Sequence, residues 1–146
     1  MFGKKPSKPQ TQIDSLIGGN TIIGGDLTFS GGLRIDGQVN GNVIASPDMP
    51  STLVLSEHGR VNGEVRVTHL VINGSISGLV SASDYLELQS KAKVEGDVHY
   101  KTMEIHLGAV VDGRLFHDSP ETDEKVLAFK TNSNADSGEN SLRKAE

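Results

Sequence analysis

Residues 35–43 of the chain read Ile-Asp-Gly-Gln-Val-Asn-Gly-Asn-Val, so that aliphatic residues and glycines alternate with polar residues. In an extended chain, residues two apart share a face, so the aliphatic residues and glycines face one way and the polar residues the other. The unit aliphatic-x-Gly-x-aliphatic occurs twice here and eight times in the whole chain. Its central glycines are Gly25, Gly37, Gly41, Gly63, Gly74, Gly78, Gly96 and Gly113.

The spacing of these units predicts the architecture. Six of the glycines (25, 41, 63, 78, 96 and 113) are separated by 16, 22, 15, 18 and 17 residues. Repeats this short are typical of solenoids, in which each unit buries its apolar face against its neighbours. The longest interval contains Ser-Pro-Asp-Met-Pro at 46–50, which indicates an inserted loop. We predict an all-β chain folded as a single parallel β-helix of about six coils, with inward glycines at corners too crowded for a side chain.

Polar segments flank the repeat. Residues 1–17 contain three lysines, two prolines and few apolar side chains, and residues 118–146 are polar and rich in turn formers. Because neither segment has enough apolar surface to form a core, we predict a flexible N-terminal tail over 1–17, a β-helix domain over 18–117 and a largely disordered C-terminal tail over 118–146. Asp118 and Glu121 have the spacing of a helix N-cap and leave open a short capping helix within residues 118–130.

The composition limits the possible functions. With 146 residues the chain has room for one domain, and 17 glycines with 4% aromatic residues suit a core of small aliphatic side chains. The lack of cysteine fits a cytoplasmic location and excludes disulfides and thiolate metal sites. A net charge of −5 argues against a nucleic-acid partner. No stretch approaches the roughly 20 apolar residues that span a bilayer.

A β-helix has two ends, and each exposes unpaired backbone groups with a cross-section of the core. Neither end of this repeat has an obvious cap, so we predict contacts between copies at both ends. Phe116 is the foremost candidate because alternation from Leu115 turns it away from the core; the alternative is that it packs beneath residues 118–130. The predicted polymerisation residues are Ile22, Ile23, Leu27, Phe29, Val111, Leu115 and Phe116.

The pattern contains no recognisable catalytic or cofactor site. The five histidines have no i, i+4 partners and share no obvious face with carboxylates, so we expect them on the surface and predict no metal site. His99 and His117 are about one coil apart but offset by one position, so they should point opposite ways. The Gly-Gly pairs at 18–19 and 24–25 lack the Lys-Ser/Thr and the helix of a phosphate loop. We therefore predict no cofactor and no enzymatic activity.

The repeated unit, the opening Ile-Ile-Gly-Gly-Asp-Leu at 22–27 and the start Met-Phe-Gly-Lys-Lys at 1–5 resemble the bactofilin family over about residues 1–117. This resemblance, rather than the spacing, implies a right-handed β-helix of triangular cross-section. It also implies head-to-head and tail-to-tail polymerisation of the chain with itself, without nucleotide. The implied role is a cytoplasmic scaffold for cell shape, envelope organisation or protein positioning, with unidentified clients that include cell-wall enzymes as candidates.

The resemblance further implies, as in many family members, an N-terminal tip that binds the anionic inner face of the cytoplasmic membrane. Met1 and Phe2 suit shallow insertion, and Lys4, Lys5 and Lys8 suit anionic lipid, each lysine contributing roughly 1 kcal/mol near the surface. One tip binds weakly, but many tips along a filament bind together. The alternative is an ordinary solvated basic tail.

Three other functions are compatible with a β-helix. A hexapeptide-repeat acyltransferase follows a strict six-residue period and needs a histidine on a projecting loop, and residues 46–50 contain none. An ice-binding protein needs a flat array of outward threonines, whereas the outward positions here are mainly Asn, Asp, Glu and Ser. A non-polymerising adaptor, with ends capped by the tails, stays open.

Overall fold

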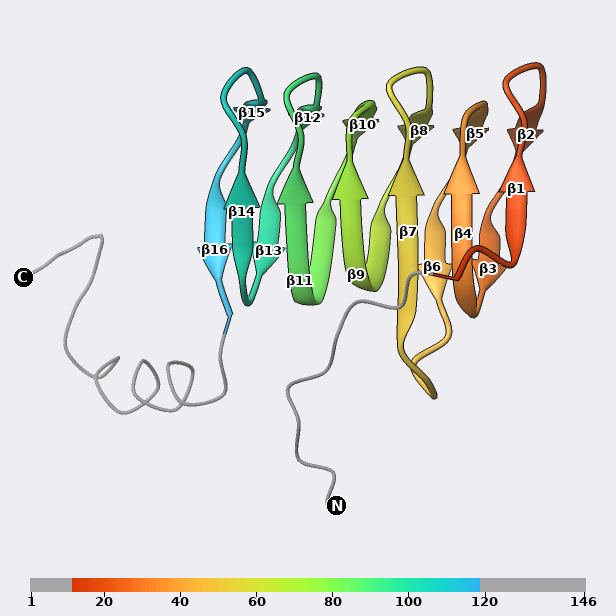
Figure 1. The fold of residues 1–146 in the computed structure, drawn as a ribbon, viewed down its shortest axis with the longest axis horizontal. Helices are drawn as coiled ribbons and strands as arrows, with labels where there is room; N and C mark the ends of the chain where they lie inside the picture. The colour runs from red at the N-terminus through yellow and green to blue at the C-terminus, as the bar shows by residue number, and fades with distance from the viewer. Residues whose placement is uncertain (1–11, 119–146) are drawn as a thin grey trace, which may run out of the picture.

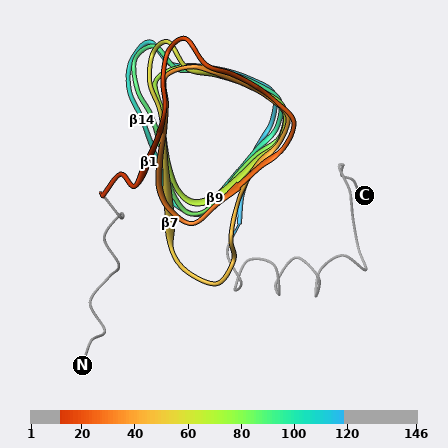
Figure 2. The same cartoon turned by 90° about the vertical axis from the view of Figure 1, so that its right-hand side faces the viewer.

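The computed structural model describes residues 12–118, and this range consists of strands and turns without a helix. The chain winds around one axis in six coils, and each coil crosses three faces (Figure 1). A view along that axis shows that the coils superimpose in a triangular outline (Figure 2). The predicted all-β parallel β-helix is therefore confirmed. Residues 1–11 and 119–146, which hold most of both predicted tails and most of the possible helix at 118–130, lie outside the described residues.

The first and third faces belong to one parallel sheet because two long strands, β9 and β11, turn a corner and continue from the third face onto the first. The first face contains β1 (Ser15–Ile17), β4 (Gly31–Ile35), β7 (Ser51–Leu55), the second halves of β9 (Val65–Ile72) and β11 (Val80–Leu88), and β14 (Met103–Ile105). The third face contains β3 (Leu27–Phe29), β6 (Val43–Ala45), the first halves of β9 and β11, β13 (Val98–Tyr100) and β16 (Leu115–His117).

The second face is a separate parallel sheet with one short strand from each coil, in the order in which the chain visits them. Every strand pairs in register with the equivalent strand of the next coil, without a bulge. Its strands are β2 (Ile22–Gly24), β5 (Gln38–Asn40), β8 (Arg60–Asn62), β10 (Ser75–Ser77), β12 (Lys93–Glu95) and β15 (Val110–Asp112).

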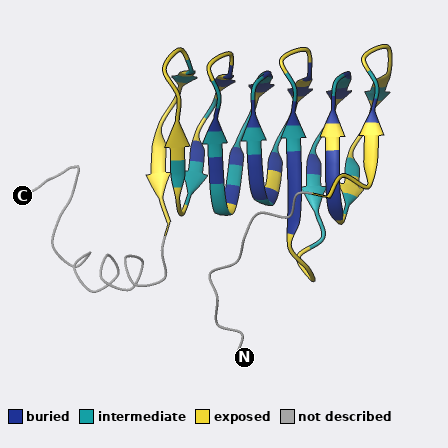
Figure 3. Ribbon diagram, viewed as in Figure 1, coloured by how far each residue is buried: buried dark blue, intermediate teal, exposed yellow. Residues whose placement is uncertain are grey.

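The core consists of columns of aliphatic side chains that run along the axis. On the second face, Val39, Val61, Ile76 and Val94 stack in register and are at most 1% exposed. Because each side chain is covered by its equivalents in the coils before and after, a chain with few aromatic residues still forms a continuous core. Burial is complete in the middle coils and falls towards both ends (Figure 3).

The predicted corner glycines lie at corners between faces, and the structure shows what a side chain would meet there. Six of them, from Gly25 to Gly113, stack where the second face turns into the third. A Cβ on any of the last five would lie 2.0 to 2.3 Å from the carbonyl oxygen of the stacked glycine one coil earlier. Gly37 and Gly74, at the corner between the first and second faces, meet carbonyl oxygens at 2.3 Å in the same way. The obstacle to a side chain is thus the backbone of the neighbouring coil.

The described strands of the β-helix run from Ser15 to His117. Strand β16 ends at His117, and the loop at 46–50 protrudes between β6 and β7 (Figure 1). At the N-terminus the first strand already begins at Ser15, within the predicted tail, and Ile17 is 8% exposed. This strand lacks the glycine unit, but it pairs with β4 in parallel register and so forms part of the first coil.

Candidate functional site: the two ends and a carboxylate-histidine cluster

Both ends of the β-helix have free backbone edges in the part of the chain that the structure describes. At the N-terminal end, β1, β2 and β3 each pair with a single strand, which belongs to the second coil. At the C-terminal end, β14, β15 and β16 pair only with strands of the fifth coil. A free strand edge is a template for pairing with another chain. The ends are therefore the first candidate site.

Five of the predicted polymerisation residues extend the inward columns to the two ends. Each is in register with an inward residue of the adjacent coil, and each is half-buried or exposed because no further coil covers it within residues 12–118. They form the exposed cross-sections of the core. The five are Ile23, Leu27 and Phe29 in the first coil, and Val111 and Leu115 in the sixth.

The outward position that begins each strand of the second face changes character at the two ends. The four interior coils have polar residues there: Gln38, Arg60, Ser75 and Lys93. The terminal coils have Ile22, which was predicted as an interface residue, and Val110, which was not. These two side chains are 67% and 50% exposed. Comparing the residue that precedes each repeat unit would have revealed Val110 from the sequence.

Phe116 lies on the outer side of the third face, as its alternation with Leu115 predicts. It is in register with His99, and the two rings stack with centroids 4.7 Å apart. The phenylalanine is 37% exposed. His117 is in register with Tyr100, one position further, so the predicted opposite orientation of His99 and His117 is confirmed. Further exposed apolar residues near the ends were not predicted: Leu16, Ile105 and Leu107.

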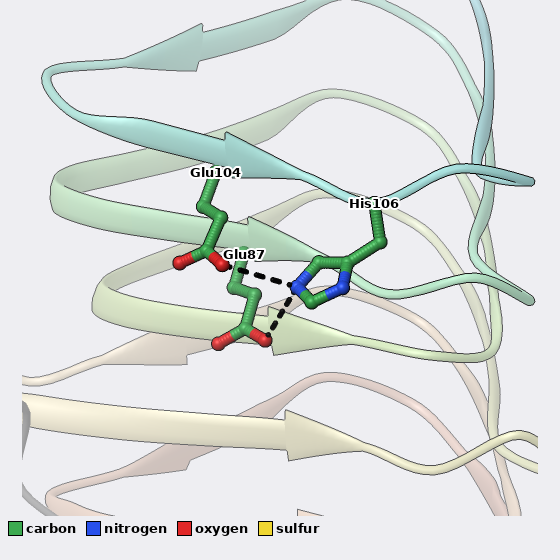
Figure 4. A group of neighbouring side chains, drawn as sticks. All are labelled: Glu87, Glu104 and His106. Carbon is green, nitrogen blue, oxygen red and sulfur yellow. Dashed lines mark hydrogen bonds and ion pairs between the residues drawn. The ribbon is translucent and has the colours of Figure 1, made fainter.

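A second candidate site joins the fifth and sixth coils on the first face. Glu87 lies on β11, Glu104 on β14, and His106 directly after β14. The imidazole Nε2 of His106 is 3.1 Å from a carboxylate oxygen of Glu87 and 3.3 Å from one of Glu104 (Figure 4). The ligand atoms of the three side chains lie within 4.8 Å of one another, so they form a group that could hold a metal ion.

The expectation that the histidines share no face with carboxylates is therefore wrong. Stacking makes neighbours of residues one coil apart, such as Glu87 and His106, and a search for helical spacing does not detect them. The repeat period of about 17 residues is the signal that could have found this cluster.

His69 contradicts the expectation that all histidines are on the surface. It is 1% exposed, with Nδ1 3.3 Å from the Ser51 carbonyl oxygen and Nε2 3.0 Å from a carboxylate oxygen of Asp84. The residue lies where β9 turns from the third face onto the first. This corner has no glycine unit, so the sequence repeat does not mark it.

The residues predicted to bind membrane, Met1, Phe2, Lys4, Lys5 and Lys8, lie outside the described residues. Within residues 12–118 the structure contains no helix of the length and apolar character needed to cross a bilayer.

Comparison with protein families links these features to a known group. The family model described as "Bactofilin: Polymer-forming cytoskeletal" matches residues 15–115, from the first strand of the β-helix to the last. Comparisons with curated proteins and with solved structures gave no significant match. The family match covers more than two thirds of the chain and the entire series of stacked coils, so the protein belongs to the bactofilin family of polymer-forming cytoskeletal proteins.

Proposed function

We propose that this bactofilin is a non-enzymatic cytoskeletal scaffold that polymerises, without nucleotide, through the ends of its β-helix. The observation that carries this proposal is the outward column of the second face, which is polar in four interior coils and apolar in both terminal coils. In an interior coil this position faces solvent, so a polar residue keeps the surface soluble. In a terminal coil an apolar residue suits the same position if another molecule covers it.

The chemistry of the ends supports docking of a second copy. Apolar side chains such as Ile22 and Val110 gain about 25 cal/mol per Å² when another surface covers them. The free edges offer backbone groups in the spacing that already joins one coil to the next. An end surface of this kind fits another end of the same chain, because a second copy presents strands of the same tilt and length. We therefore place assembly along the axis of the rod.

Negative-stain electron microscopy of the purified protein in nucleotide-free buffer tests this proposal. We expect filaments from the unmodified chain, and short rods or dimers from Val110→Arg and from Phe116→Arg, because a charge would be buried in the interface. The matched controls are Ser75→Arg and Ser81→Arg, which place the same side chain at the equivalent positions of interior coils. These controls should still form filaments.

Circular dichroism of each variant would establish that the β-helix is folded. Filaments of normal length from both Val110→Arg and Phe116→Arg would contradict end-to-end assembly. Short rods from the unmodified chain would instead support a non-polymerising adaptor, and compact trimers would support an acyltransferase.

We further propose that the filament lies at the inner face of the cytoplasmic membrane, where it serves cell shape, envelope organisation or the positioning of client proteins such as cell-wall enzymes. Sedimentation with phosphatidylglycerol vesicles tests the membrane contact of the tip. Phe2→Glu should reduce the bound fraction, whereas Gln10→Glu, with the same change of charge away from Met1 and Phe2, should reduce it less. Equal binding of both variants and the unmodified chain would remove the tip from the proposal.

A further inference from the structure

The carboxylates of Glu87 and Glu104 are stacked directly on each other. They occupy paired positions of β11 and β14 in parallel register. Like charges in this arrangement repel and destabilise the pairing of the two strands. A cation bound at this point of the first face would remove the repulsion between the two carboxylates.

Neighbouring basic residues neutralise four other carboxylates of the β-helix. Asp36 pairs with Arg34, Glu64 with Arg66, Glu95 with Lys93 and Glu57 with Lys91. By contrast, within residues 12–118 the only ion-pair partner of Glu87 and of Glu104 is His106. One imidazole carries at most one positive charge, so it does not balance two carboxylates.

Two further side chains orient the carboxylates. The hydroxyl of Tyr85 donates a hydrogen bond to Glu104 at 2.8 Å, and the amide of Gln89 donates one to Glu87 at 3.2 Å. Such second contacts fix the direction of ligand atoms in metal sites.

We propose that Glu87, Glu104 and His106 bind a divalent transition-metal ion of the zinc type, which bridges the fifth and sixth coils. One imidazole and two carboxylates suit such ions, and the two negative charges balance the charge of the metal. Tetrahedral bonds of about 2.1 Å put ligand atoms roughly 3.4 Å apart. The nitrogen-to-oxygen distances of 3.1 and 3.3 Å are already close to this separation. Three protein ligands leave a position for water or for a further donor.

The bound ion acts on the stability of the last coil. Among residues 12–118, strand β14 has a hydrogen-bonded neighbour on one side only, in the fifth coil. A metal held by one ligand from the fifth coil and two from the sixth removes the repulsion and adds a link between them. Metal binding thus stabilises the coil that forms the C-terminal end, whether or not that end polymerises.

The test uses the untagged full chain, freed of metal by a chelator. Equilibrium dialysis against Zn²⁺ gives the stoichiometry, and a Co²⁺ titration followed by visible absorption reports the ligand field. For the unmodified chain we expect one Zn²⁺ bound per chain at this site and a visible absorption band from bound Co²⁺. Both signals should disappear in Glu87→Gln and in His106→Gln. Tyr85→Phe removes the hydrogen bond to Glu104 and should weaken Zn²⁺ binding about 10-fold.

The matched controls are Glu57→Gln and His58→Gln. These residues form another exposed imidazole-carboxylate pair, 3.5 Å apart, outside the cluster, and the controls should bind as the unmodified chain does. Zn²⁺ should also raise the thermal midpoint of the unmodified chain and leave that of Glu87→Gln unchanged. The proposal is overturned if the unmodified chain shows no saturable binding, or if folded Glu87→Gln and His106→Gln bind Zn²⁺ and Co²⁺ as tightly as the unmodified chain.

Discussion

The stack of corner glycines is the most demanding feature at the scale of single residues. A Cβ on Gly63 would lie 2.1 Å from the carbonyl oxygen of Gly41, and backbone atoms cannot move away as a flexible side chain can. We expect Gly63→Ala to lower the free energy of unfolding by about 3 kcal/mol, as overpacked and strained substitutions do. Urea unfolding followed by circular dichroism measures the change.

Gly24→Ala is the matched control for this prediction. Gly24 ends a strand of the second face in the first coil, and no heavy atom lies within 4 Å of its added Cβ. We expect a change within about 1 kcal/mol, in the stabilising direction, because alanine restricts the unfolded chain. Equal effects of the two substitutions would show that the neighbouring carbonyls do not set the requirement for glycine.

Short polar side chains at the same corner carry hydrogen bonds between coils. The amide oxygen of Asn42 accepts the backbone N–H of Glu64 at 2.8 Å, while the N–H of Asn42 donates to Asp26 at 2.9 Å. Asn42→Ala leaves the N–H of Glu64 without that acceptor, and we expect a loss of about 1 kcal/mol in unfolding free energy. Asn20→Ala, at an exposed corner position, should change it by less than half as much. A larger loss of unfolding free energy in Asn20→Ala than in Asn42→Ala would contradict this role for Asn42.

Residues that recur from coil to coil can be predicted from the sequence, whereas residues whose contacts occur only once, such as His69, cannot. The corner glycines and inward aliphatic residues recur, so their period alone locates them. The burial of His69 depends on Ser51 and Asp84, which belong to other coils and recur nowhere. Contacts of this kind follow from the lengths of the corners, which vary between coils.

At the scale of the strands, the terminal elements differ from the interior ones in their hydrogen bonding. On the second face, β8 and β10 are bonded on both sides, whereas β2 and β15 are bonded on one side within the described part of the chain. The Val110→Arg variant provides the unassembled protein for this test. In it, we expect the amide hydrogens of β8 and β10 to exchange at least about tenfold more slowly than those of β2 and β15. Hydrogen-deuterium exchange read by mass spectrometry makes this comparison. Uniform protection along the face would contradict it.

The elements themselves were largely predictable because a constant period makes coils stack in register. Two deviations show the limit of this argument. Strand β1 has only three residues and no glycine unit, and only its pairing with β4 reveals it. The turns between the first and second faces have two residues at 36–37 and 73–74 but four at 18–21, 56–59, 89–92 and 106–109. Corners of unequal length keep the strands stacked although the coils differ in length.

At the scale of the whole molecule, the rod is the same along its length except at its ends. Its interior columns are buried and its outward positions on the second face are polar, whereas the terminal coils expose Ile22, Val110 and Phe116. The sequence predicts the two ends because neither end of the repeat has an obvious cap. Of the apolar outward residues, Ile22 and Phe116 were predicted from the sequence, and Val110 would have become evident from a comparison of the residues that precede each repeat unit. This asymmetry between the interior and the ends is the basis for assembly along the axis.

Fibre diffraction from aligned filaments tests this axial assembly most directly. If rods join end to end, their strands lie across the filament and successive coils repeat along it, so the strand spacing of about 4.8 Å must appear on the meridian. We predict this meridional reflection. The same reflection on the equator would mean that the rods lie across the filament, and it would contradict assembly through the ends of the β-helix.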